Sequence, residues 1–136
     1  MLKVLLRVKA GRAYLVSDAT PLAGCLPGMY TQPLGGTVRL DENGRLALVD
    51  QPEILAGSAT PLKDPVARMV AHGMGDLWEI WDLASIRPAQ FWNRPTAAGL
   101  NIGAPADLVR FKLEGNLLTI GQTMKRGAGV YERGDL

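Results

Sequence analysis

The sequence contains one cysteine and one histidine among its 136 residues. Because Cys25 stands alone, an internal disulfide is excluded, which suits a reducing compartment, and the cytoplasm is the expected location. A catalytic thiol needs a nearby base, and His72 lies far along the chain in a helical pattern. We therefore interpret Cys25 as a loop residue and His72 as a surface or partly buried structural residue. We interpret Asp41 and Glu42 as polar residues of a turn. No metal-ligand set is therefore predicted within this chain.

Long apolar runs are missing too. None approaches the roughly 20 residues that cross a bilayer, and the opening MLKVLLRVKAG is too short and too charged for a signal peptide. The basic residues are scattered, the formal net charge is only +2, and aromatics make up 6% of the chain. No basic run alternates with aromatics, so neither nucleic acid nor a membrane is an expected partner. The overall composition, with 47% apolar and 21% charged residues, is typical of one globular domain.

The first predicted elements are a helix over residues 2–8 and a strand over residues 13–18. The helix has Leu2, Leu5 and Leu6 on one face. The strand is apolar at almost every position, which is typical of strands buried on both faces in the parallel sheets of α/β proteins. It ends on a carboxylate, Asp18. This residue either caps the segment that follows or points into a site, and the pattern alone leaves both interpretations open.

The middle and end of the chain give local signals of a different kind. Asn43-Gly44 predicts a hairpin over residues 37–49, because both central residues of the favoured turn need positive φ. Residues 61–92 are predicted to be helical, with Asp76 capping the second of three helices. The tail alternates and predicts three strands. Three tryptophans are expected to pack rather than to form a sugar platform: Trp78, Trp81 and Trp92.

Four short motifs carry a resemblance to a known family: LVSDAT, LAGSA, ASIRPA and ADLVRF. ADLV and ASIRPA are similar to motifs of many amidohydrolases. LVSDAT and LAGSA at this spacing are more specific, and with them the chain resembles the C-terminal third of N-acetylglucosamine-6-phosphate deacetylase, a member of the amidohydrolase superfamily. The resemblance runs over nearly the whole chain.

The resemblance implies an α/β fold: the C-terminal fragment of a metal-dependent (β/α)₈ barrel, with the last strand and helices in residues 1–100, and returning strands of a small β-sandwich in residues 101–136. It also implies that Asp18 transfers a proton from a metal-activated water to the leaving amine. Leu55, Ala56 and Gly57 match a loop that contacts the substrate, an amino-sugar phosphate. The implied ion is divalent, with zinc expected.

The chain departs from the family in size and in metal ligands. A barrel of this type takes about 250 residues, and the family's glutamate and histidine ligands lie on earlier strands that have no equivalents in this sequence. We therefore expect the isolated chain to be inactive and to be a cloned fragment, a truncated product or half of a split enzyme. Its expected partner is the missing N-terminal segment or a second copy of itself. Two alternatives stay open: a non-catalytic β-rich assembly domain, and part of an amidohydrolase that acts on a cyclic amide.

Overall fold

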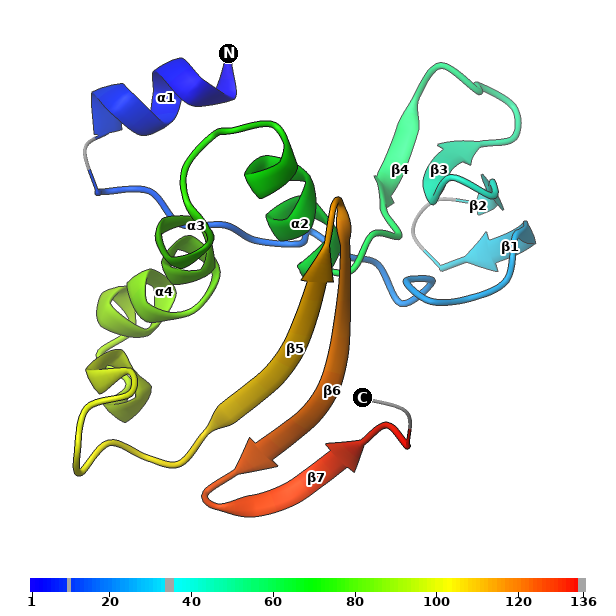
Figure 1. Cartoon of the computed structure of the whole chain (residues 1–136). Helices are drawn as coiled ribbons and strands as arrows, with labels where there is room; N and C mark the ends of the chain where they lie inside the picture. The colour runs from blue at the N-terminus through cyan, green and yellow to red at the C-terminus, as the bar shows by residue number, and fades with distance from the viewer. Residues whose placement is uncertain (10, 34–35, 135–136) are drawn as a thin grey trace. The chain divides into compact units, whose positions relative to one another are not determined.

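The computed structural model describes residues 1–9, 11–33 and 36–134. The chain divides into two compact units (Figure 1). Residues 16–62 form one, which we call the sheet unit, and residues 1–15 with 63–136 form the other, which we call the mixed unit. Each contains an antiparallel sheet, and all described helices belong to the mixed unit, so the chain is a mixed α/β protein. The domain division expected at residue 100 stays a prediction.

The sheet unit is a meander of four antiparallel strands in the order β1-β2-β3-β4. The strands are β1 (Gly28–Gln32), β2 (Gly36–Leu40), β3 (Arg45–Leu48) and β4 (Leu55–Ser58). Because side chains alternate along each strand, one face of the sheet collects apolar residues. That face forms a small core of Val38, Leu40, Leu46 and Ala59, and the side chains packed against it are Leu22, Tyr30, Leu48 and Ala56.

The predicted hairpin is confirmed by the pairing of β2 with β3. Its turn is longer than the expected two-residue form, because residues 41–44 connect the strands and Gly44 is the member with positive φ, at 77°. The Asp41 carboxylate explains the difference. Its Oδ1 accepts the backbone N–H of Asn43 at 2.9 Å and that of Arg45 at 2.8 Å, which stabilises a wider turn. Asn43 therefore does not need the left-handed conformation that the sequence pattern predicted.

The mixed unit packs helices against a three-stranded antiparallel sheet of order β5-β6-β7. The strands are β5 (Leu108–Glu114), β6 (Leu117–Lys125) and β7 (Ala128–Glu132). The helices are α1 (Leu2–Lys9), α2 (Lys63–Ala71), α3 (Leu77–Ala84), α4 (Ile86–Phe91) and the 3-10 turn η1 (Pro95–Ala98). The helical middle and the three C-terminal strands are thus confirmed. Residues of α2, α3 and β6 form the core: Val66, Ala67, Met69, Ile80, Leu83 and Leu118.

Helix α3 begins as the sequence predicted. Asp76 Oδ1 accepts the Glu79 N–H at 2.8 Å, and Glu79 Oε2 accepts the Asp76 N–H at 3.2 Å, which completes a capping box. Trp81 stacks on Phe111 of β5 with ring centroids 4.4 Å apart. The expected packing is wrong for the other two tryptophans, since Trp78 is 70% and Trp92 63% exposed. Trp78 lies about 200° around the helix from the buried Ile80, so it points away from the core.

The strand predicted over residues 13–18 is wrong. Residues 12–18 belong to no ladder, although Leu15 N–H donates to the Leu83 carbonyl at 2.8 Å. The side chain of Val16 is 68% exposed. A strand buried on both faces needs hydrogen-bonded neighbours on both sides, and no described strand runs beside this segment. Its first sheet contact comes one residue after Asp18, as an isolated parallel bridge between Ala19 and Ser58.

Candidate functional site

Asp18 stands out for its backbone conformation. Its φ is 51°, and the described non-glycine residues that share a positive φ are Asn93 and Arg126. Aspartate enters the left-handed region more readily than most residue types, but such positions are uncommon and often functional. The Asp18 side chain is exposed, and no hydrogen bond or ion pair to a described residue occupies its carboxylate.

Strand β4 holds the segment that follows Asp18. Besides the bridge from Ala19 to Ser58, the Thr20 N–H donates to the Ser58 carbonyl at 2.7 Å. The Ser58 hydroxyl in turn accepts the Thr60 N–H at 3.1 Å. Residues 19–20 are therefore tied to the end of β4 by backbone hydrogen bonds, which keep Asp18 beside this strand without using its side chain.

Gly57 makes this close approach possible. Its φ is +98°, and a Cβ built on it would lie 2.6 Å from Thr20 Cγ2. Real Cβ atoms do not come so near another carbon, and the positive φ is itself strained for any residue with a side chain. The two motifs predicted to share a site, LVSDAT and LAGSA, are thus brought side by side, with a glycine at their contact.

The predicted substrate residues lie on strand β4 and not on a loop. Leu55 and Gly57 are exposed, whereas Ala56 is half-buried and packs against the sheet unit's core. This alternation follows from strand geometry, because successive side chains point to opposite faces. Of the three predicted residues, Leu55 is the one with an exposed side chain, at 61%. The sequence interpretation missed that Ser58 and Thr20 join the two motifs, although both residues stand inside them.

A metal ion does not fit the described residues. No group of three or more His, Cys, Asp or Glu side chains lies together among residues 1–9, 11–33 and 36–134. His72 and Cys25 are both exposed, and Asp41 is engaged in the β2–β3 turn. Around Asp18 the described residues therefore offer no set of metal ligands.

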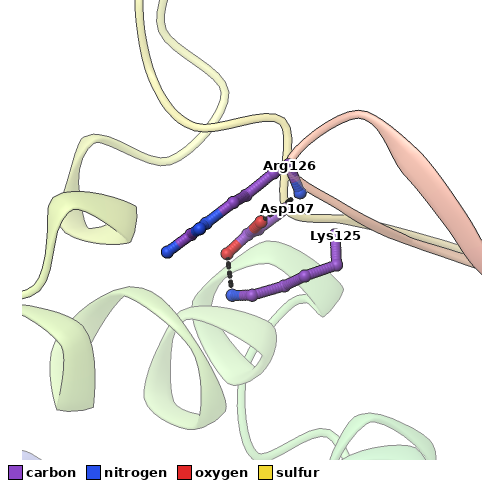
Figure 2. A network of polar contacts seen from close by, with 3 residues as sticks. All are labelled: Asp107, Lys125 and Arg126. Carbon is purple, nitrogen blue, oxygen red and sulfur yellow. Dashed lines mark hydrogen bonds and ion pairs between the residues drawn. The ribbon is translucent and has the colours of Figure 1, made fainter.

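A second polar cluster, in the mixed unit, is structural (Figure 2). Asp107 Oδ1 accepts the Arg126 N–H at 2.8 Å, and its Oδ2 pairs with the Lys125 ammonium. The hydrogen bond from Lys125, followed by that from Arg126, holds the pKa of Asp107 below its ordinary value of 3.8. Arg126 lies in the turn between β6 and β7 and has a left-handed backbone conformation, with φ 51°. The Asp107 carboxylate connects this turn to the start of β5. Asp107 is the acidic residue of the ADLV motif, and in this structure its carboxylate makes structural contacts.

Comparison with solved structures finds N-acetylglucosamine-6-phosphate deacetylases among the structures that match the fold. N-acetyl-D-glucosamine-6-phosphate deacetylase from Mycobacterium smegmatis matches 96% of this chain and 34% of its own, at 27% identity and a TM-score of 0.76. An Asp-to-Ala mutant of that protein, in complex with N-acetyl-D-glucosamine-6-phosphate, matches 95% and 33% at 25% identity and a TM-score of 0.75. The Thermotoga maritima N-acetylglucosamine-6-phosphate deacetylase matches 98% and 35% at 25% identity and a TM-score of 0.76.

The resemblance first seen in the motifs is therefore confirmed by structure: the chain is similar to part of N-acetylglucosamine-6-phosphate deacetylases. It spans about a third of the length of the solved chains it matches. No protein-family model matches the sequence, and no curated protein does. Among the described residues, no helix combines the length and the apolar character needed to cross a bilayer.

Proposed function

We propose that Asp18 and strand β4 form part of a site that hydrolyses the acetamide group of N-acetylglucosamine 6-phosphate. The observation that supports this most strongly is the close approach of Thr20 to Gly57, which keeps an exposed and unpaired carboxylate beside β4. The substrate is inferred from the matched deacetylases, one of which is a complex with this sugar phosphate. In this proposal β5–β7 correspond to returning strands of a sandwich.

The chemistry assigned to Asp18 is proton transfer in two steps. Amides are poor electrophiles, and their amine is a poor leaving group. As the oxygen of a water molecule attacks the acetyl carbonyl carbon, Asp18 accepts one proton from that water. As the C–N bond breaks, Asp18 returns the proton to the departing nitrogen, and the products are glucosamine 6-phosphate and acetic acid, which releases the second proton of the water as it ionises to acetate. General acid–base catalysis of this kind accelerates a reaction on the order of 10²- to 10⁴-fold.

The remaining parts of the site are proposed to come from polypeptide beyond residues 1–136. The family resemblance implies a divalent ion, and the described residues offer no cluster that fits one. They offer one exposed leucine, Leu55, toward a ligand from β4. We therefore expect the isolated chain, supplied with zinc or another divalent ion, to show no turnover of N-acetylglucosamine 6-phosphate.

A chimeric enzyme tests the proposal. In the M. smegmatis deacetylase, the matched third is replaced by the full 136-residue chain, and acetate release from N-acetylglucosamine 6-phosphate is measured. We expect activity, and we expect Asp18→Asn to lower kcat by about 10²- to 10⁴-fold. Asparagine also enters the left-handed region, so the melting temperature should not change. Asp50→Asn removes an exposed carboxylate from the same unit and serves as the matched control, with unchanged kcat.

The other outcomes point to specific alternatives. A folded chimera that lacks activity would contradict the proposal and favour a non-catalytic assembly domain. A folded chimera that hydrolyses a cyclic amide instead would favour a different amidohydrolase. Turnover by the isolated chain with zinc, at a rate comparable to a full-length deacetylase, would show that the ligands do not need to come from elsewhere.

A further inference from the structure

The turn between β2 and β3 contains a residue pair with a chemistry of its own. Asn43 and Gly44 follow each other in this turn, and Asn43 is exposed. No hydrogen bond to a described residue holds its carboxamide. Gly44 has no side chain, so its backbone nitrogen is sterically open to the carboxamide carbon of the residue before it. The pair can therefore react with itself, by attack of that nitrogen on the Asn43 side chain.

The other asparagines of the chain lack this arrangement. Each is followed by a residue with a large side chain, and the three pairs are Asn93-Arg94, Asn101-Ile102 and Asn116-Leu117. Asn116 is the best comparison, because it too is exposed and lies in the connection between two paired strands, β5 and β6. The branched side chain of Leu117 crowds the nitrogen that would attack. Asn43 and Asn116 thus differ mainly in the residue that follows.

Hydrogen bonds to Asp41 oppose the reaction at Asn43. The Gly44 N–H donates to the Asp41 carbonyl at 3.1 Å. The Asp41 carboxylate accepts the N–H groups of Asn43 and Arg45, one on each side of Gly44. The Gly44 nitrogen can lose its proton and turn toward the Asn43 side chain only when these bonds open, and opening them costs free energy. The turn therefore protects the pair for as long as it stays closed.

We propose that Asn43 is a site of spontaneous deamidation, and that the Asp41 carboxylate sets its rate by holding the turn closed. Hydroxide removes the Gly44 amide proton, and the nitrogen attacks Asn43 Cγ. As the N–Cγ bond forms, the Cγ–Nδ2 bond breaks, and the side-chain nitrogen takes a proton from water and leaves as ammonia. Water then opens the cyclic imide at one of its two carbonyls, which gives aspartate or isoaspartate at position 43. The reaction needs only water, so it is independent of the proposed function.

The products change the sheet unit in two ways. Both add a negative charge beside Asp41 and Glu42, and isoaspartate also lengthens the main chain of the turn by one carbon atom. The turn lies close to Thr60, since a Cβ built on Gly44 would be 3.5 Å from its Oγ1. The Thr60 N–H donates to the hydroxyl of Ser58 at the end of β4. We therefore expect the converted chain to lose hydrogen-exchange protection in β1–β4 and to keep it in β5–β7.

Mass spectrometry of the full 136-residue chain tests the site. The chain is incubated at mildly alkaline pH, and samples taken at the start and at later times are digested with trypsin. Cleavage after lysine and arginine gives peptide 40–45, which contains Asn43, and peptide 113–125, which contains Asn116. We expect peptide 40–45 to gain the mass difference between an amide and an acid, with a fraction that protein isoaspartyl methyltransferase labels. Peptide 113–125 should stay unchanged over the same time.

Three variants test the role of Asp41. Asp41→Ala should raise the rate at Asn43 about two- to tenfold, the factor that corresponds to one lost hydrogen bond. Glu42→Ala removes the neighbouring exposed carboxylate and is the matched control, with an unchanged rate. Asp41→Asn keeps an acceptor oxygen and should restore most of the protection. Wild-type chain unfolded in urea should convert faster than folded chain at the same pH, and this measurement decides the matter if Asp41→Ala does not fold.

Each contrary result overturns a stated part of the proposal. Equal conversion at Asn43 and Asn116 overturns the site. A rate that is unchanged or lower in Asp41→Ala overturns the protective role of Asp41, because the carboxylate would then be idle or would assist proton removal. Equal acceleration by Asp41→Ala and Glu42→Ala overturns it as well, since charge and not hydrogen bonding would set the rate. Unfolded chain that converts no faster than folded chain overturns protection by the turn.

Discussion

The mixed unit and the sheet unit differ in charge and in exposed apolar surface. The mixed unit has thirteen basic and eight acidic residues, and the sheet unit has two basic and five acidic ones. Most described apolar side chains that are more than 60% exposed belong to the mixed unit, among them Val4, Val8, Trp78, Phe91 and Trp92. The mixed unit thus carries most of the strongly exposed apolar side chains, whereas the sheet unit has an acidic surplus and contains the exposed Asp18.

The largest expected effects come from the two cores. Leu46 in the sheet unit is 0% exposed and Leu118 in the mixed unit is 1% exposed. Each change to alanine, Leu46→Ala or Leu118→Ala, should lower the free energy of unfolding by about 2–5 kcal/mol, through lost burial and the cavity left behind. Hydrogen exchange should show the main loss of protection in β1–β4 for the first and in β5–β7 for the second. Equal loss in both sheets from either variant would contradict the division into units.

The next largest effect on stability is expected at the contact between Gly57 and Thr20. Gly57→Ala should destabilise the sheet unit by about 3 kcal/mol, because it combines a strained φ with a steric clash. Gly24→Ala is the matched control: its φ is +88°, and an added Cβ would meet nothing within 4 Å. The control should cost about 1 kcal/mol, from the backbone alone. Urea unfolding measures both, and equal costs would show that β4 does not hold the Asp18 segment closely.

A smaller effect is expected at the start of α3 in the mixed unit. Asp76→Ala removes the acceptor for the Glu79 N–H and should lower the free energy of unfolding by about 1 kcal/mol. Asp76→Asn keeps a capping oxygen, so it should cost only a few tenths of that. Thermal unfolding followed by circular dichroism measures the two variants, and an asparagine variant as unstable as the alanine variant would contradict the capping account.

The smallest effect, and the one that depends on pH, is expected at Asp107. Its pKa in the folded chain lies below the ordinary 3.8 because of the hydrogen bond from Lys125. The ionised carboxylate therefore stabilises the fold fully above the unfolded pKa, and this contribution is lost as the pH falls through the folded pKa. Asp107→Asn should lower the melting temperature slightly at neutral pH, and the difference from wild type should disappear in acid. Lys125→Met should reproduce part of the loss, and a difference that persists in acid would argue against the ion pair.

The features predicted correctly depend on short stretches of chain. The Asp76 cap, the β2–β3 hairpin and the three C-terminal strands each arise from residues close together in sequence. The features predicted wrongly depend on distant neighbours. Residues 13–18 have the composition of a buried strand, but no described strand lies beside them. The LAGS segment was interpreted as a loop, and it became strand β4 because β3 lies alongside it.

For the candidate site, the residues to compare could be chosen from the sequence alone: an aspartate that ends an apolar segment, and a glycine-containing motif that follows the hairpin. Tertiary structure decided how they meet, with Gly57 against Thr20, Ala56 turned into the core and Asp18 left exposed. The two kinds of feature differ in how far apart in sequence the interacting residues lie. Turns and caps are fixed by hydrogen bonds within a few residues, whereas the bridge joins Ala19 to Ser58 across the whole intervening meander.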